Sequence, residues 1–228
     1  AWYEDWYGVN NATLVVVGAV EPESVRAMAA KHFGELEARP TPELKVREEM
    51  APVGEQRLTV HHEQATPFLR MGYRAPSLGT AEATSEPYAL SVLAQVLDGG
   101  RSARLPTELV RGQEIAAGIS AGYRRAARLE THFVIQGRPT EEHDLDALEA
   151  AVRKQVAQVR DEGISEQELA RAKVQLRAGR VYRLDSLSGQ AFEIGALEAI
   201  GIGHEAIDAF DQRLADVSRD DVQAVAER

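Results

Sequence analysis

The 228-residue sequence contains no cysteine, which excludes disulfide bonds and thiolate metal sites. It also lacks any apolar run close to the roughly 20 residues of a membrane helix, so we expect no membrane span. Positive charge is scarce, because 26 Lys and Arg stand against 36 Asp and Glu, giving a formal net charge of −10. Binding to a phosphate backbone requires clustered Lys and Arg, so we expect no nucleic-acid partner.

The common catalytic motifs are missing as well. The sequence has no His-x-x-Glu-His in either direction and no Gly-x-Ser-x-Gly. His61 and His62 are adjacent on a predicted strand, so their side chains would point to opposite faces and could not chelate one ion. Gly99-Gly100 lacks the Lys and the spacing of a phosphate loop and instead indicates the end of a helix. We therefore predict no catalytic residue, no metal ligand and no cofactor within this chain.

The beginning of the chain shows a strand pattern followed by a helix pattern. Ala12 to Gly18 reads ATLVVVG, a β-branched run typical of a buried strand, and Pro22 opens a helix at its favoured first position. Residues 39–54 contain several prolines among charges and lack periodicity, which indicates a linker. The chain starts at Ala1 in an aromatic stretch without Met, and we interpret it as part of something longer.

Strand and helix patterns alternate in pairs after this linker. Alternating runs predict strands at Gln56 to Glu63 and Pro67 to Ala75, and a later hairpin from Ile115 to Arg124 and Thr131 to Arg138. A helix is predicted from Ser85 to Gly99, a short one within Arg101 to Gly112, and only helices after residue 140. This order predicts an α+β fold of two layers, a mixed sheet covered by helices on one face.

Four segments in order along the chain resemble the pitrilysin/insulinase family of zinc metallopeptidases, which includes mitochondrial processing peptidase. They are WYEDWYGVNNATLVVVGAVEPESVRAMAAKHFGEL (2–36), LDGGRSARLPTELVRGQEIAAGISAGYRR (97–125), GISEQELARAKVQL (163–176) and RLADVSRDDVQAVAER (213–228). The first resembles the stretch that closes the N-terminal half in this family, and the others resemble its C-terminal, non-catalytic half.

The resemblance implies a domain division and a set of partners. Residues 1–38 would be the strand-helix tail of a preceding N-terminal half, 39–54 the linker, and 55–228 the C-terminal domain without its last strand. In this family the N-terminal half carries His-x-x-Glu-His and binds zinc, so zinc is expected in the missing half and not in this chain. The expected partners are that zinc-bearing half and a peptide substrate. Because the C-terminal sheet would lack a strand, we expect residues 12–18 to pair with it, within one chain or between two.

The resemblance also points to one substrate-contacting residue. In this family an Arg and a Tyr, about seven positions apart, contact substrate from the C-terminal half. Arg111 matches the Arg, whereas the Tyr position falls at Gly118. Tyr123 is the nearest tyrosine, but its strand parity places it on the face opposite to Gly118. A chain without the Tyr resembles the zinc-bearing chain of a two-subunit enzyme, in which a second family subunit supplies the Arg/Tyr pair.

Two functions remain open at this point. The chain is either the non-catalytic half of a zinc metalloendopeptidase, which closes the chamber and helps to bind peptide, or a structural and interaction subunit of the same fold. The compartment is the bacterial periplasm or the cytoplasm, and the family resemblance favours the periplasm.

Overall fold

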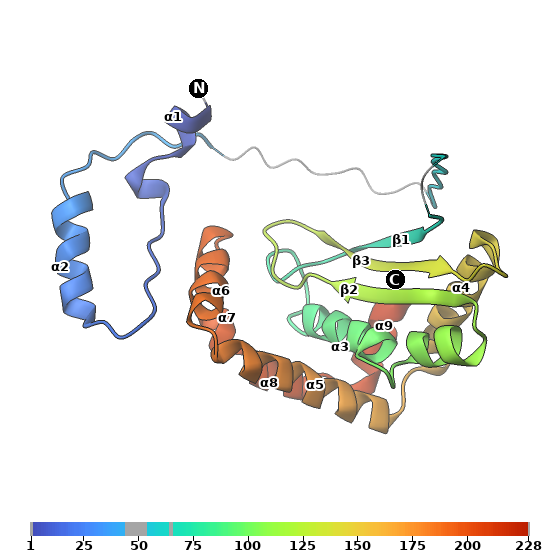
Figure 1. Cartoon of the computed structure of the whole chain (residues 1–228). Helices are drawn as coiled ribbons and strands as arrows, with labels where there is room; N and C mark the ends of the chain where they lie inside the picture. The colour runs from blue at the N-terminus through green and yellow to red at the C-terminus, as the bar shows by residue number, and fades with distance from the viewer. Residues whose placement is uncertain (1, 44–53, 64–65, 228) are drawn as a thin grey trace. The chain divides into compact units, whose positions relative to one another are not determined.

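The computed structural model describes residues 2–43, 54–63 and 66–227, and its chain divides into two compact units, residues 1–65 and 66–228. The first unit has helices but no strand among its described residues. It contains α1 (Trp2–Trp6), the 3-10 turn η1 (Val9–Asn11) and α2 (Pro22–Phe33) (Figure 1). Pro22 stands in the first turn of α2, as the sequence predicts. None of the described residues in this unit is buried, so the unit has no core of its own within that part.

Two strands expected from the sequence are wrong. Residues 12–18 and 56–63 belong to no strand among the described residues, and the expected pairing of 12–18 with the sheet, within one chain or between two, stays a prediction. A β-branched or alternating run favours an extended conformation, but it does not specify a neighbouring strand for backbone hydrogen bonds. The predicted linker falls largely on residues 44–53, which lie outside the described residues. At its start, the Asn10 side chain holds Arg39 through two hydrogen bonds of 3.0 Å, one to the carbonyl and one from the N–H.

The second unit carries the sheet and most of the helices. Its elements are β1 (Leu69–Ala75), α3 (Glu86–Asp98), the π-helical turn η2 (Pro106–Gly112), β2 (Ala116–Tyr123), β3 (Thr131–Pro139), α4 (Leu145–Glu162), α5 (Glu166–Leu184), α6 (Leu187–Ala199), α7 (Glu205–Asp208), α8 (Phe210–Asp216) and α9 (Arg219–Ala226). The predicted short helix before Gly112 is present but wound more widely, with Gln113 N–H donating to the Glu108 carbonyl at 2.8 Å.

The described strands form one antiparallel sheet in the order β1-β3-β2. The predicted hairpin of β2 and β3 is confirmed. The expected mixed sheet is replaced by antiparallel pairing in the described residues, because the segments at 12–18 and 56–63 contribute no further strand. Alternation along β1 leaves Arg70 and Arg74 exposed, while Ala75 is buried.

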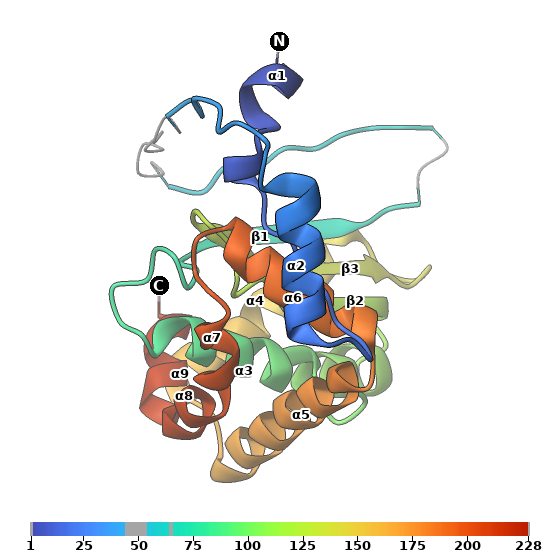
Figure 2. The ribbon, with the colours of Figure 1, turned by 90° about the vertical axis from the view of Figure 1, so that its left-hand side faces the viewer.

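Helices cover one face of this sheet, which confirms the α+β fold. Figure 1 shows α3, α4 and α9 beneath the strands, and Figure 2 shows α8 and α9 beside α3. The apolar stripe predicted for α3 is buried in full: Ala89, Val92, Leu93, Val96 and Leu97. It packs with residues from the sheet and from the later helices, including Ile135, Leu148, Val152, Leu214 and Val222.

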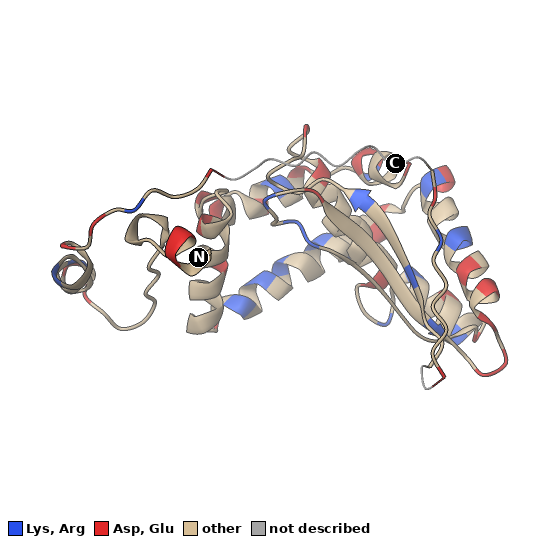
Figure 3. Ribbon diagram, turned by 90° about the horizontal axis from the view of Figure 1, so that it is seen from above, with Lys and Arg blue, Asp and Glu red and all other residues tan. Residues whose placement is uncertain are grey.

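The other face of the sheet is open to solvent in this unit. Figure 3 looks onto it from above and shows basic residues on the strands. The outward-facing strand positions include Arg70, Arg74, His132 and Arg138. No outward-facing position on β1, β2 or β3 is Asp or Glu. In a chain with a net charge of −10, this face is locally basic.

An ion pair fixes the turn between α4 and α5. Gly163 ends α4 with a φ of 71°, a left-handed conformation that favours glycine. Ser165 and Glu168 then form the capping box predicted for α5. Arg104 donates to both Glu168 carboxylate oxygens at 2.6 and 2.9 Å, and to the Gly163 carbonyl at 3.1 Å. Arg104 thereby anchors the start of α5, the helix that forms one wall of the site described next.

Candidate functional site

A hollow of about 510 Å³ lies between α3, α5 and the end of β2. We call it the α3–α5 hollow. Its polar lining comes from widely separated parts of the sequence: Ser91, Gln95, Asp98, Arg125, Gln175 and Arg183. Phe210 of α8 adds an aromatic ring to the lining. The sequence alone does not predict this site, because none of the contributing segments carries a motif by itself.

The α3 wall of the hollow has the spacing of a metal-binding helix without its ligands. Ser91, Ala94 and Gln95 stand at positions i, i+3 and i+4, the spacing of His-x-x-Glu-His, and all three line the hollow. Ser91 Oγ donates to the Pro87 carbonyl at 2.7 Å, and Gln95 Nε2 donates to Gln175 Oε1 of α5 at 3.2 Å. A hydroxyl, a methyl and an amide do not fit zinc, which takes imidazole, thiolate or carboxylate ligands.

Asp98 closes the end of the hollow nearest the sheet. Its carboxylate accepts the Ala121 N–H at 3.1 Å, a backbone donor on β2, which is an edge strand in the described sheet. Burial raises the pKa of Asp98, and the hydrogen bond from Ala121 opposes that shift. This carboxylate is therefore occupied by the protein's own backbone.

Arg125 presents a guanidinium to the hollow without a hydrogen bond to it. Its Nε is buried and has no partner among the described residues. The guanidinium carbon lies 4.6 Å from the centre of the Phe210 ring and 5.3 Å from that of Tyr88. Burial lowers the pKa of Arg125 from its usual value, and the charge of Arg183 adds to this effect. The sequence gives one signal for this position. Side chains alternate between the two faces of a strand, and Arg125 falls two residues after Tyr123 and four after Ala121, which face the helices, so its side chain is expected on the same side.

Arg111, the residue that the resemblance assigns to substrate, lies at the end of η2 and not in the α3–α5 hollow. It is exposed, and its guanidinium donates to Thr107 Oγ1 at 2.9 Å. Gly118 lies on β2, where an added Cβ would meet nothing within 4 Å. The Tyr123 hydroxyl donates to the Pro76 carbonyl, and burial raises the pKa of this hydroxyl. Tyr123 is thus held on the other face of the strand from Gly118.

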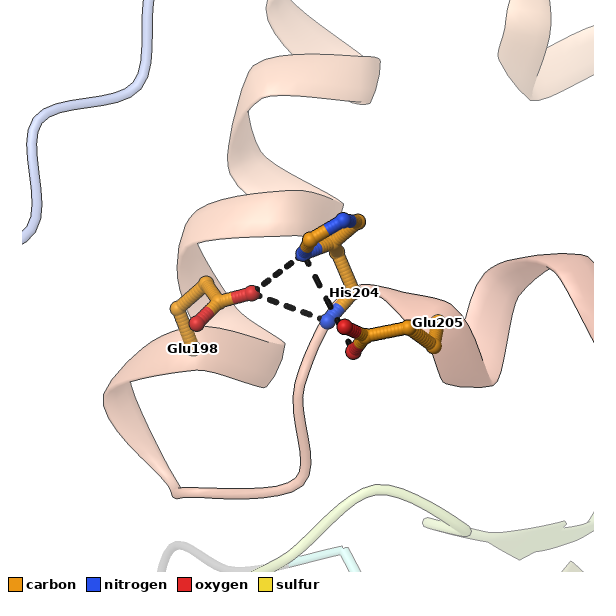
Figure 4. A group of neighbouring side chains, drawn as sticks. All are labelled: Glu198, His204 and Glu205. Carbon is orange, nitrogen blue, oxygen red and sulfur yellow. Dashed lines mark hydrogen bonds and ion pairs between the residues drawn. The ribbon is translucent and has the colours of Figure 1, made fainter.

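A group of potential metal ligands occurs between α6 and α7 (Figure 4). Glu198 Oε1 accepts from the backbone N–H of His204 at 2.9 Å and lies 2.7 Å from its Nδ1, while Glu205 Oε2 is 4.0 Å from the same nitrogen. These bonds raise the pKa of His204 and lower that of Glu198. None of the three residues belongs to a motif in the sequence, from which no metal ligand is predicted within this chain. The cluster, in which Glu198 is half-buried and His204 and Glu205 are exposed, closes a turn containing Gly201 and Gly203, both with positive φ.

The part of the chain that the structure describes has no helix with the length and apolar character needed to cross a membrane.

Comparison with protein families gives a match over most of the chain. Residues 1–176 match the family described as "Peptidase M16 inactive domain". Among curated proteins, the chain is 26% identical over 196 residues to the zinc protease PqqE of Helicobacter pylori, an alignment covering 82% of this chain and 41% of that protein. The chain therefore spans less than half the length of this relative.

Solved structures show the same fold. A protease from Helicobacter pylori superposes with a TM-score of 0.80 at 21% identity, covering 92% of this chain and 50% of that one. The periplasmic protease PqqL from Escherichia coli superposes with a TM-score of 0.65 at 16% identity, covering 92% of this chain and 23% of that one. The match of residues 1–176 to the inactive-domain family confirms the resemblance drawn from the sequence segments.

Proposed function

Because the chain belongs to the peptidase M16 inactive-domain family, we propose that it forms the non-catalytic half of a zinc metallopeptidase, closes the peptide chamber and contacts the substrate. The match to the inactive domain over residues 1–176 carries this proposal. The α3–α5 hollow supports it, because its wall offers polar groups for binding but no set of zinc ligands. Zinc and the water that it activates would belong to a preceding catalytic half.

The open face of the sheet supports a role in holding extended peptide. A second hollow of about 480 Å³ lies on this face, lined by residues that include Arg70, Ser120, Gly122 and Gln136. Gly122 lines both hollows and an added Cβ there would meet nothing within 4 Å, so the backbone is accessible at this position. Arg111, on the same unit, is the proposed contact near the scissile bond. Within this family a second subunit supplying an Arg/Tyr pair is a further proposed partner.

An experiment on the full-length protein tests the proposal. We expect chelator-sensitive peptide cleavage, and we expect Gly122→Trp to lower kcat/KM while the zinc content stays the same, because the indole would occupy the second hollow on the open face of the sheet. Ala150→Trp, on an exposed position of α4 outside both linings, is the matched control and should leave kcat/KM unchanged. Equal kinetics for the two variants would contradict a substrate-binding role.

The alternative function is that of a structural or interaction subunit without a peptidase role. The observation in its favour is the exposed apolar surface of α5 and α6, formed by Val174, Val181, Tyr182, Leu184, Leu187 and Phe192. We propose that this surface meets the zinc-bearing half, whereas in the alternative it would meet another subunit. A full-length protein that holds no zinc and cleaves no peptide would support the alternative. We propose a periplasmic rather than a cytoplasmic location, in keeping with the description of one solved structure of the same fold as a periplasmic protease.

A further inference from the structure

Two arginines stack on the Phe210 ring, but only one of them has an anionic partner in the described structure. Arg180 lies 5.4 Å from the ring centre and donates to Asp211 Oδ2 at 2.8 Å. Arg125 lies closer, at 4.6 Å, and its guanidinium forms no hydrogen bond or ion pair with the described residues. Aromatic rings hold the plane of a guanidinium but provide no in-plane acceptor.

The groups around Arg125 do not provide a hydrogen-bond acceptor for its guanidinium. Arg183 lines the same hollow and contributes a second positive charge. Asp98 is engaged with the Ala121 N–H, and Glu193 on α6 influences Arg125 only through space, without an ion pair in the described chain. A buried donor without a partner lowers the stability of a fold, so an external acceptor is favoured at this point.

We propose that the α3–α5 hollow binds a peptide carboxylate, with Arg125 as the anchoring residue and Arg183 as the second cation. A carboxylate matches the planar fork of a guanidinium, which can donate two parallel hydrogen bonds. The nearby Asp98 and Glu193 favour a singly charged group over a phosphate dianion. The peptide nature of the ligand rests on the proposed function, whereas the carboxylate preference follows from the hollow alone.

Three short labelled alanine-based peptides distinguish the sources of the carboxylate. One contains an internal Glu and an amidated C-terminus, the second replaces this Glu by Gln, and the third has the Gln and a free C-terminus. Each is titrated into the full-length protein by fluorescence anisotropy, with a zinc chelator present to prevent cleavage. The variants are Arg125→Gln and Gly179→Glu, and Arg180→Gln is the matched control on the same ring.

We expect a carboxylate-bearing peptide to bind about tenfold or more tightly than the neutral one. Arg125→Gln should abolish this preference, and Arg180→Gln should preserve it. Gly179→Glu places a carboxylate in the lining, since a Cβ at Gly179 lies 3.9 Å from Arg183, and should also abolish the preference. This variant decides the question if Arg125→Gln fails to fold.

Measurable binding of all three peptides with equal affinity, or a preference that persists in Gly179→Glu, would overturn the assignment of a carboxylate site. Inorganic phosphate that competes as well as acetate would overturn the carboxylate class. Thermal stabilisation by N-acetylglutamate, lost in a folded Arg125→Gln variant, would support the carboxylate site even if no peptide binds. In that case the peptide nature of the ligand is refuted, whereas the inference that the hollow binds a carboxylate stands.

Discussion

Replacing Glu168 by Gln should destabilise the second unit, because this carboxylate joins Arg104 to the turn that starts α5. The hydrogen bonds from Arg104 are the main reason that the pKa of Glu168 falls to about 2, and those from Ser165 add to them. Compared with an ordinary Glu pKa of about 4.3, this corresponds to about 3 kcal/mol. The carboxylate remains in reach of solvent, with a side chain 16% exposed, so we expect about 1–2 kcal/mol after screening.

The effect should depend on pH in a defined direction. The pKa of Glu168 is lower in the folded state, so its contribution is fully present above about pH 4.3 and is lost as the pH falls toward 2. At neutral pH, Glu168→Gln should lower Tm by about 2–8 °C in a thermal melt followed by circular dichroism. The difference between wild type and variant should shrink as the pH is lowered through this window.

Glu166 provides a matched control two positions away. It pairs with Arg219 at 2.9 Å, but the two side chains are 77% and 48% exposed, so Glu166→Gln should cost at most about 0.5 kcal/mol. If Glu168→Gln and Glu166→Gln melt alike at neutral pH, or if the Glu168 effect does not depend on pH, the assignment of Arg104 as an anchor is incorrect.

Three further predictions concern chemistry and pH. Arg111→Ala should reduce turnover much less than loss of a partner subunit's Tyr, for which we expect a reduction of about 10²–10³-fold. Steady-state kinetics measure both effects. Equal losses of turnover would refute the assignment of this half to the zinc-bearing chain. The chain expressed alone, including its Gly118→Tyr variant, should cleave no peptide and hold no stoichiometric zinc after dialysis, and one tightly held zinc by elemental analysis would contradict this. His204 has a raised pKa, so its pairing with Glu198 stabilises the fold at low pH, and this stabilisation is lost as the pH rises through that pKa. His204→Gln should therefore remove the contribution of this pair from the pH dependence of Tm. An unchanged dependence of Tm on pH would contradict a stabilising role of the pair.

The sequence predicts the local elements of this fold more successfully than their partners. The capping box at Ser165 and Glu168 marks the start of α5, because both of its hydrogen bonds form within one turn. By contrast, the ATLVVVG run at 12–18 has strong strand character but forms no strand, because the required neighbour is not specified locally. The same limitation applies to the alternating run at 56–63.

The candidate site could be predicted only in part for a related reason. The segments that resemble the C-terminal half of the family are a property of the sequence, and they indicate the non-catalytic half. The α3–α5 hollow depends on bringing Gln95 beside Gln175 and Arg125 beside Phe210, contacts between distant segments that no motif encodes. The alternation of side chains along β2 is the one indication of Arg125 in the sequence, since it places a cation on the side where apolar residues are expected.

The hydrogen bond between Asp98 and β2 has a consequence for self-association. An edge strand offers unpaired backbone groups on which another molecule can add a strand, and an ionised carboxylate at Ala121 makes that addition costly. Burial raises the pKa of Asp98, so this carboxylate becomes neutral at a higher pH than an ordinary aspartate does. The protection against edge-to-edge aggregation is therefore weakest in acidic surroundings, where the chain also loses part of the negative charge that keeps its copies apart.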